Sequence, residues 1–176
     1  MRRSLIAVAC VLCATPALAL DMPARRAGLW ELKMSFDNGG MPGQTMRQCI
    51  DVETDRLMQS NFGGSPRQTC TKQEVAREGK TVVVDSVCRF AGVTTTSHAV
   101  ITGSFDSAYT MKVTTWRDGA PPAPGLSVDG ANHLTIAATW LGPCAAGQRA
   151  GDMMMPNGRT VNVRDMRSLR AMRRPQ

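Results

Sequence analysis

The sequence predicts a mainly β protein of one domain, in which an antiparallel meander forms a curved sheet or a barrel-like closure. A short helix is expected after Cys49, and a basic helix or tail at the C-terminus. Several segments alternate apolar and polar residues with a period of two, which is typical of half-buried strands. Turn-forming residues separate these segments, as they do in a meander. No helical pattern alternates with the strands, which argues against a parallel α/β sheet.

The first 19 residues have the pattern of an export signal. Two arginines precede an apolar run, and the segment ends in "ALA", the small-x-small pattern that signal peptidases accept. The apolar run is about half as long as a membrane-spanning helix needs to be. A lipid-modified Cys10 and a twin-arginine signal fit the sequence less well. We therefore expect a signal peptide at 1–19, a periplasmic location, one β-rich domain over 20–163, and a basic tail over 164–176.

The mature chain opens with two predicted strands and a helix. From Trp30 to Phe36 the even positions are apolar and the odd positions polar, which predicts a half-buried strand. After the turn-rich "DNGGMPGQ", the segment "TMRQCI" returns as a second strand. Residues 51–60 begin with Asp51, a candidate N-cap, and predict a short helix.

The clearest local signal is the hairpin "CTKQEVAREGKTVVVDSVC". Two β-prone segments flank Gly79, and folding about it pairs position i with position 158 − i. This register sets Cys70 opposite Cys88, at a separation that a disulfide bond accepts. Four cysteines remain after export, for which three pairings exist, and by elimination Cys49 pairs with Cys144. No spacing among these four cysteines is CxxC, so a zinc site is not expected.

Three more strands are predicted downstream, "VTTTSHAVITGSF", "AYTMKVTTW" and "NHLTIAATW". The proline- and glycine-rich "RDGAPPAPGLSVDGA" connects the last two. In "LGPCAAGQRAGDMMMP" we expect irregular chain that Cys144 anchors, with alternate methionines covering apolar surface. "RTVNV" predicts a short strand, and the residues after it a basic amphipathic helix. We expect that helix to be solvated or frayed, or else to dock on the domain, an anionic membrane or an acidic partner.

The charge of the chain is concentrated at its ends. The formal net charge is +7, of which Arg2 and Arg3 contribute two and residues 164–176 contribute four, so the domain carries about +1 (7 − 2 − 4). The chain has one tyrosine and four phenylalanines. A nearly neutral domain with so few aromatic residues lacks the basic face and the stacking platforms of a nucleic-acid-binding protein.

No motif of a familiar catalytic site is present, and the carboxylates are scattered. His98 and His133 are expected to be structural, so we expect that the protein is not an enzyme. We therefore assign no catalytic, cofactor-binding or metal-binding residue. A hydrolase with a spatially assembled site is an alternative. A methionine-based metal or redox-stress protein is another, because the thioethers of Met153, Met154 and Met155 suit copper(I). Adjacent residues of an extended chain point to opposite faces, however, so the triplet alone cannot supply three ligands.

The tryptophans are the remaining candidates for a binding role. Trp30 and Trp140 lie on the apolar faces of their predicted strands. We expect them to share the core, and the alternative is that they line an apolar ligand cavity. The sequence therefore favours a non-enzymatic binding module for a small apolar ligand or another envelope protein.

Four stretches together resemble one protein family. They are "RRAGLWELKMSF", "RQC" at Cys49, the Cys70–Cys88 hairpin, and "WLGPCAAGQRAGDMMMPNG". The family is the set of small exported bacterial proteins known as domain of unknown function 3617. Ala27 stands where that family usually has proline before Gly-Leu-Trp-Glu. The resemblance covers essentially the whole mature chain and implies an envelope location and a β-rich, disulfide-bonded domain; it implies no catalytic residues.

Overall fold

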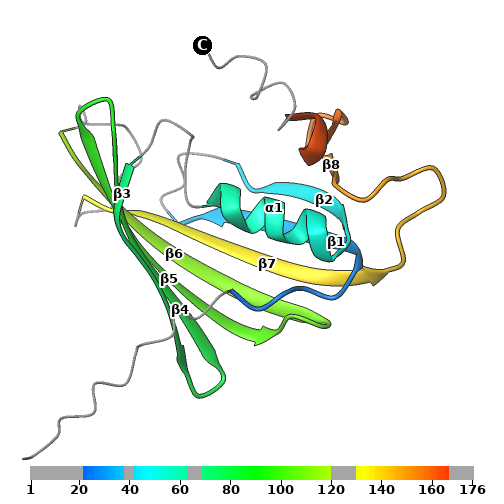
Figure 1. The fold of residues 1–176 in the computed structure, drawn as a ribbon, viewed down its shortest axis with the longest axis horizontal. Coiled ribbons are helices and arrows are strands. Elements are labelled where there is room, and N and C mark those ends of the chain that lie inside the picture. The colour runs from blue at the N-terminus through cyan, green and yellow to red at the C-terminus, as the bar shows by residue number, and fades with distance from the viewer. Residues whose placement is uncertain (1–21, 38–41, 63–68, 120–129, 167–176) are drawn as a thin grey trace, which may run out of the picture.

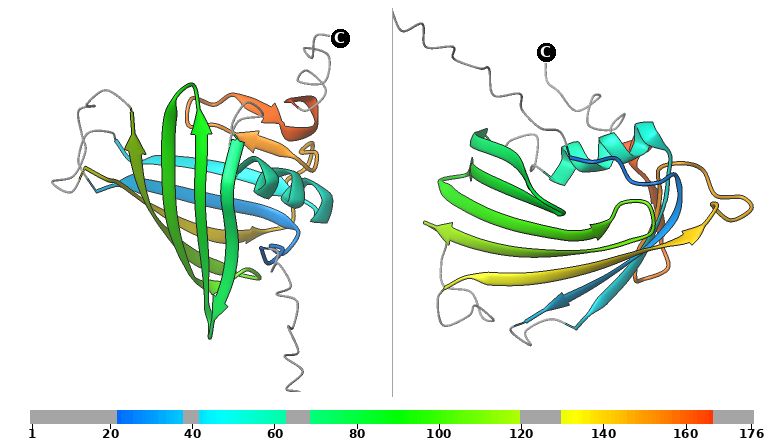
Figure 2. Two further views of the ribbon diagram at one scale, coloured as in Figure 1. Left: turned by 60° about the vertical axis from the view of Figure 1, so that its left-hand side comes forward. Right: turned by 90° about the horizontal axis from the view of Figure 1, so that it is seen from below.

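The structure, a computed structural model, describes residues 22–37, 42–62, 69–119 and 130–166. Within these residues nine strands form a single antiparallel sheet (Figure 1). The sheet is strongly curved but does not close into a barrel (Figure 2). The predicted mainly β fold is confirmed, in its curved rather than its closed form. The predicted signal peptide lies outside the described residues.

Two strands and a helix begin the described chain, as predicted. β1 (Gly28–Phe36) and β2 (Gln44–Ile50) pair antiparallel, and α1 (Val52–Phe62) follows. Asp51 caps this helix: its Oδ1 accepts the backbone N–H of Thr54 at 2.7 Å, and Thr54 Oγ1 accepts the backbone N–H of Asp51 at 2.9 Å. The bond from the Thr54 backbone holds the pKa of Asp51 below its ordinary value.

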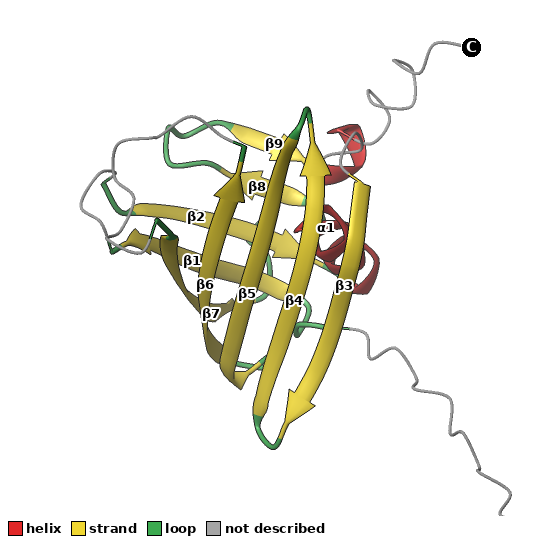
Figure 3. Cartoon of the chain, turned by 90° about the vertical axis from the view of Figure 1, so that its left-hand side faces the viewer, coloured by secondary structure: helices red, strands yellow, loops and turns green. Residues whose placement is uncertain are grey.

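The middle of the chain is a meander in which each strand pairs with the next. It consists of β3 (Thr69–Glu78), β4 (Thr81–Phe90), β5 (Val93–Ser104), β6 (Ala108–Asp118) and β7 (Asn132–Gly142). Connections of two or three residues join β3 to β4, β4 to β5 and β5 to β6, and Figure 3 shows these four strands side by side. The strands predicted from the period-two pattern are therefore confirmed.

The order of strands in the sheet departs from a simple meander, because β2 does not pair with β3. The order is β3-β4-β5-β6-β7-β1-β2-β8-β9, so β1 pairs with both β2 and β7. α1 carries the chain from β2 towards the far edge of the sheet, where β3 begins, and lies on the concave side (Figures 2 and 3). The curved sheet thus acquires an inner face on which the helix packs.

The predicted hairpin register holds at the cysteines but not at the turn. Glu78 pairs with Thr81, so the turn has two residues. The numbers of two paired residues sum to 159 from this pair as far as Lys72 and its partner Val87. A bulge at Thr71 absorbs one residue and restores the expected sum of 158, with Cys70 opposite Cys88. Both predicted disulfide bonds are present, Cys70–Cys88 and Cys49–Cys144.

The C-terminal part adds two short strands to the sheet, β8 (Asp152–Met154) and β9 (Thr160–Asn162). The strand predicted in "RTVNV" is confirmed. The expectation of irregular chain through the methionine triplet was wrong, because β8 pairs with β2, with Met153 opposite Gln48. One helical turn occupies residues 163–166. The rest of the predicted basic helix lies outside the described residues.

The core lies between the concave face of the sheet and α1. Trp30 is fully buried, and Ile50, Met58 and Val163 join it from β2, from α1 and from the turn after β9. The predicted core position of Trp30 is thereby confirmed. Among the described residues no helix has both the length and the apolar character needed to cross a membrane.

Candidate functional site

A buried ion pair fixes α1 on the sheet. Arg25 lies just before β1 and Asp55 in the first turns of α1, with side chains 4% and 0% exposed. The Nε of Arg25 donates to Oδ1 of Asp55 at 2.8 Å, and the backbone N–H of Arg25 donates to Oδ2 at 2.8 Å. Charges this deeply buried are tolerated only when they are paired and hydrogen-bonded, and here both conditions are met.

Neutral polar groups complete this network. Gln59 Nε2 donates to Oδ2 of Asp55 at 2.9 Å, and Nη1 of Arg25 donates to Oε1 of Gln48 at 3.0 Å. Tyr109 lies beside them, and burial raises the pKa of its phenol, against the opposing effect of the Arg25 charge. No buried side-chain nitrogen or oxygen among the described residues lacks a hydrogen-bond partner. The buried polar atoms of this network are thus satisfied by each other and by neighbouring protein groups such as the carbonyl of Pro23.

The two tryptophans lie opposite each other on β1 and β7, next to this network. Trp30 Nε1 donates to the carbonyl of Arg26 at 2.8 Å, and its ring centroid lies 5.6 Å from that of Tyr109. Trp140 Nε1 donates to the carbonyl of Ala27 at 3.1 Å, and the guanidinium of Arg26 lies 3.8 Å above the Trp140 ring, a cation–π contact. Both indoles therefore form hydrogen bonds and ring contacts with neighbouring protein groups. The alternative that the two tryptophans line a ligand cavity stays a prediction.

The inner face of the sheet changes from buried to exposed along its strands. Side chains directly opposite each other in paired strands lie on the same face, so they form cross-strand rows. The first, which we call the deep row, packs in the core with Met58 of α1, and its side chains are at most 8% exposed. The deep row consists of Val82, Ile101, Met111 and Ile136.

The next row along the strands, which we call the valine row, is also apolar. Apart from the buried Ala99, its side chains are partly exposed, and those of Val75, Val84, Val113 and Leu134 pack against the core. Figure 3 shows four of the strands that carry this row, β3 to β6. The valine row consists of Val75, Val84, Ala99, Val113, Leu134 and Phe36.

A third row, which we call the hydroxyl row, follows directly and carries no charged residue. Its Ser97 Oγ and Thr115 Oγ1 lie 3.4 Å apart, within reach of a hydrogen bond. The Cys70–Cys88 disulfide lies one row further along. The inner face therefore presents an apolar strip bordered by uncharged hydrogen-bonding groups. The hydroxyl row consists of Gln73, Ser86, Ser97, Thr115 and Asn132.

The histidines lie on the opposite, convex face. His98 Nδ1 is 2.8 Å from Oδ1 of Asp85, and His133 Nδ1 is 3.2 Å from Oγ1 of Thr114. The four residues form one cross-strand row. The carboxylate contacts one imidazole and the hydroxyl contacts the other, whereas a hydrolytic triad requires both on the same imidazole. Among the described residues, histidine, cysteine and acidic side chains form no group of three that could hold a metal ion.

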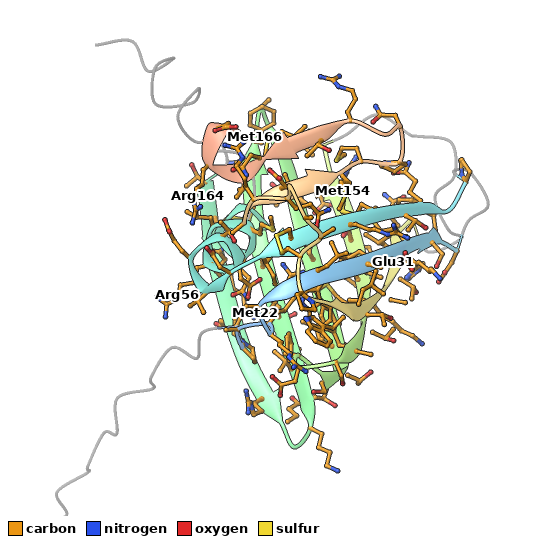
Figure 4. The ribbon with its side chains drawn as sticks, turned by 90° about the vertical axis from the view of Figure 1, so that its right-hand side faces the viewer. Met22, Glu31, Arg56, Met154, Arg164 and Met166 are labelled. Carbon is orange, nitrogen blue, oxygen red and sulfur yellow. A yellow bond between two sulfur atoms is a disulfide. The ribbon has the colours of Figure 1, made fainter. Side chains whose placement is uncertain are left out.

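The methionine triplet is divided between the two faces of the β8–β9 hairpin. Met153 and Met155 line a partly open pocket of about 290 Å³, together with Met166 from the following turn. The sulfur of Met154 instead accepts a hydrogen bond from Nε2 of Gln148 at 3.1 Å. Figure 4 shows Met154 on β8 and Met166 on the turn after β9.

Sequence reasoning missed three features of this site. The Arg25–Asp55 pair spans 30 residues, and no local pattern announces it. Met166 lies in the predicted basic tail, for which docking on the domain is only an alternative, yet it contacts the core. The hydroxyl row had a readable signal, because Ser86 and Ser97 occupy positions of the same parity as the apolar residues of their strands.

Comparisons with known proteins identify the family of the chain. Searches of curated proteins and of solved structures gave no significant match. The family model described as protein of unknown function (DUF3617) matches residues 25–144, which is more than half of the chain and contains Arg25 and all four disulfide cysteines. The chain therefore belongs to the DUF3617 family of proteins of unknown function.

Proposed function

We propose that this protein binds, without catalysis, a small amphipathic molecule on the inner face of its sheet. The ligand has an apolar chain, which contacts the valine row, and an uncharged polar head, which hydrogen-bonds to the hydroxyl row. The proposal makes the sequence-based expectation of a small apolar ligand more specific, because it assigns the ligand a head group and a position.

One observation carries the proposal: the valine row is apolar, continuous across six strands and still partly exposed. At about 4.8 Å between neighbouring strands, six strands extend about 24 Å, which is long enough for an alkyl chain. An exposed apolar strip bordered by polar groups is typical of a ligand-binding surface. The absence of charge from the hydroxyl row favours a neutral head, since an ionised head would lose its hydration without gaining a counter-ion.

The proposed location is the periplasm, reached by means of the signal peptide at 1–19. Two disulfide bonds support it, because they indicate an oxidising compartment outside the cytoplasm. The absence of catalysis is likewise part of the proposal. The saturated Arg25–Asp55 network and the divided contacts of His98 and His133 support it.

The test uses Val84 and Val83, which are neighbours on β4 and are both partly exposed, on opposite faces of the sheet. Binding of monolaurin, a neutral monoacylglycerol, is measured by isothermal titration calorimetry with the disulfide-bonded protein. We expect V84K to weaken binding at least tenfold and the control V83K to leave it unchanged. Laurate, which has the same chain with a charged head, should bind more weakly than monolaurin.

The gentler variant V84T guards against misfolding, because it conserves the shape of the side chain and adds a hydroxyl to the apolar strip. It should weaken monolaurin binding in a protein whose urea midpoint is close to that of the wild type. Absence of monolaurin binding by the wild type, or equal effects of V83K and V84K, would overturn the proposal.

A further inference from the structure

The turn after β9 brings a third methionine to the pair that the β8–β9 hairpin presents. The backbone N–H of Met155 donates to the carbonyl of Arg159 at 2.8 Å, which closes the hairpin. Met153 and Met155 then lie on one side of it and line one pocket. Met166 reaches the same pocket from the helical turn. The fold thus supplies the third thioether that the triplet alone cannot supply.

The backbone that carries Met166 is fixed at two points. The N–H of Val163 donates to the carbonyl of Gly151 at 2.9 Å, which ties the start of the turn to the hairpin. Nη2 of Arg164 lies 2.8 Å from Oε2 of Glu53 and 3.2 Å from Oδ2 of Asp51, which ties the turn to the N-terminus of α1. Met166 is therefore presented to the pocket by a turn with tertiary anchors on both the hairpin and the helix.

The chemistry of the pocket is that of soft ligands. Its other lining residues are Asn157, Arg159 and Val161, so no carboxylate, imidazole or thiolate lines it. Hard cations and zinc lack ligands there, whereas thioethers bind Cu(I) and its analogue Ag(I). In an oxidising compartment, where the chain's described cysteines are disulfide-bonded, thioethers remain available as sulfur ligands.

We propose that Met153, Met155 and Met166 form a binding site for a soft monovalent cation, Cu(I) or Ag(I). The flexible methionine side chains, with three rotatable bonds each, allow the sulfurs to converge on one ion. Arg159 is exposed, so solvent screens the repulsion between its charge and a bound cation. The repulsion that remains is weaker for a monovalent ion than for a divalent one. Met154 is excluded from the site, because its sulfur accepts the amide of Gln148 on the other face of β8.

The experiment is a titration of the disulfide-bonded protein with Ag(I), a probe that undergoes no redox change. The methyl groups of the methionine side chains are observed by carbon-13 NMR. We expect one equivalent of Ag(I) to shift the signals of Met153, Met155 and Met166, and to leave those of Met154 and Met34 in place. Cu(I), added under anaerobic reducing conditions that preserve the disulfide bonds, should shift the same three signals.

Single leucine variants identify the ligands, because leucine conserves the volume of methionine and removes the sulfur. M153L, M155L and M166L should each weaken Ag(I) binding at least tenfold, whereas the matched control M154L should bind as the wild type does. V84K should also bind Ag(I) normally, which separates this site from the proposed amphiphile site. No saturable Ag(I) binding, an equal effect of M154L, or loss of binding on replacing His98 and His133 instead would overturn the proposal.

Discussion

Removing Asp55 tests whether the Arg25–Asp55 pair holds the helix on the sheet. Asp55 is fully buried and accepts three hydrogen bonds, two from Arg25 and one from Gln59. In D55A the guanidinium of Arg25, whose side chain is 4% exposed, keeps its charge but loses its carboxylate. Leaving one member of a buried ion pair unpaired costs about 3–5 kcal/mol, a large part of the roughly 5–15 kcal/mol by which a domain is stable.

The double variant R25M/D55L should recover much of this loss. Replacing both members of a buried pair by apolar residues of similar volume is often close to neutral. In the double variant Oε1 of Gln48 and the backbone N–H at position 25 lose their partners, at about 1–3 kcal/mol for each unsatisfied buried group, whereas Gln59 still donates to the carbonyl of Pro23. D55A deprives the same backbone N–H of its acceptor and in addition leaves a buried charge unpaired. We therefore expect the double variant to be less destabilised than D55A, with a favourable coupling energy of about 2 kcal/mol or more between the two positions.

The assay is urea unfolding of the disulfide-bonded variants, followed by circular dichroism. R47M is the control, because Arg47 forms an exposed ion pair with Glu31 at 3.0 Å, and it should change the unfolding free energy by less than about 1 kcal/mol. The double-mutant cycle also requires the single variants R25M and D55L. The reasoning is refuted if D55A costs no more than R47M, or if the loss of R25M/D55L equals the sum of the losses of R25M and D55L.

Two further predictions concern the disulfide bonds and the tyrosine. Replacing Cys49 and Cys144 by alanine should cost about 4.7 kcal/mol, against about 3 kcal/mol for Cys70 and Cys88, because in the chain-entropy model the bridged separations of 95 and 18 residues set the loss. Equal urea midpoints of the two double variants would contradict this. Burial raises the pKa of Tyr109 above its ordinary value of 10.0, so the tyrosine ionises at lower pH in the unfolded state than in the folded state. The contribution of Tyr109 to the free energy of unfolding is therefore fully present below about pH 10 and is lost as the pH rises through the folded-state pKa. Tyrosinate absorbance reports Tyr109 alone, as the single tyrosine of the chain, and Y109F should remove this part of the alkaline loss; titration at the ordinary pKa would contradict it.

Sequence reasoning was most successful where the determinants are local. Period-two alternation located β1 and β7, Asp51 marked the start of α1, and Gly79 marked the hairpin that joins Cys70 to Cys88. These features depend on side chains a few residues apart, or on a turn whose φ of +62° favours glycine.

The features that escaped prediction depend on contacts between distant parts of the chain. Nothing in the alternation of β7 specifies that its partner is β1, because every half-buried strand presents the same pattern. The bulge at Thr71 shifts the register by one residue and so sets Cys70 opposite Cys88. Met166 lines the pocket of the proposed metal site from a turn that Val163 ties to the hairpin and Arg164 ties to α1.

The insertion of β1 between β2 and β7 has a consequence for the order of folding. The N-terminus of a chain is synthesised first, yet β1 lacks one neighbour until Gly142, the last residue of β7, has been synthesised. The β3–β7 hairpins need only local contacts and can form meanwhile, which favours rapid folding of that part. Docking of β7 on β1 is then the late, non-local step, and only this step brings Cys144 to Cys49. We therefore expect the long-range disulfide bond to form after β7 has paired with β1, whereas the Cys70–Cys88 bond needs only the β3–β4 hairpin and can form earlier.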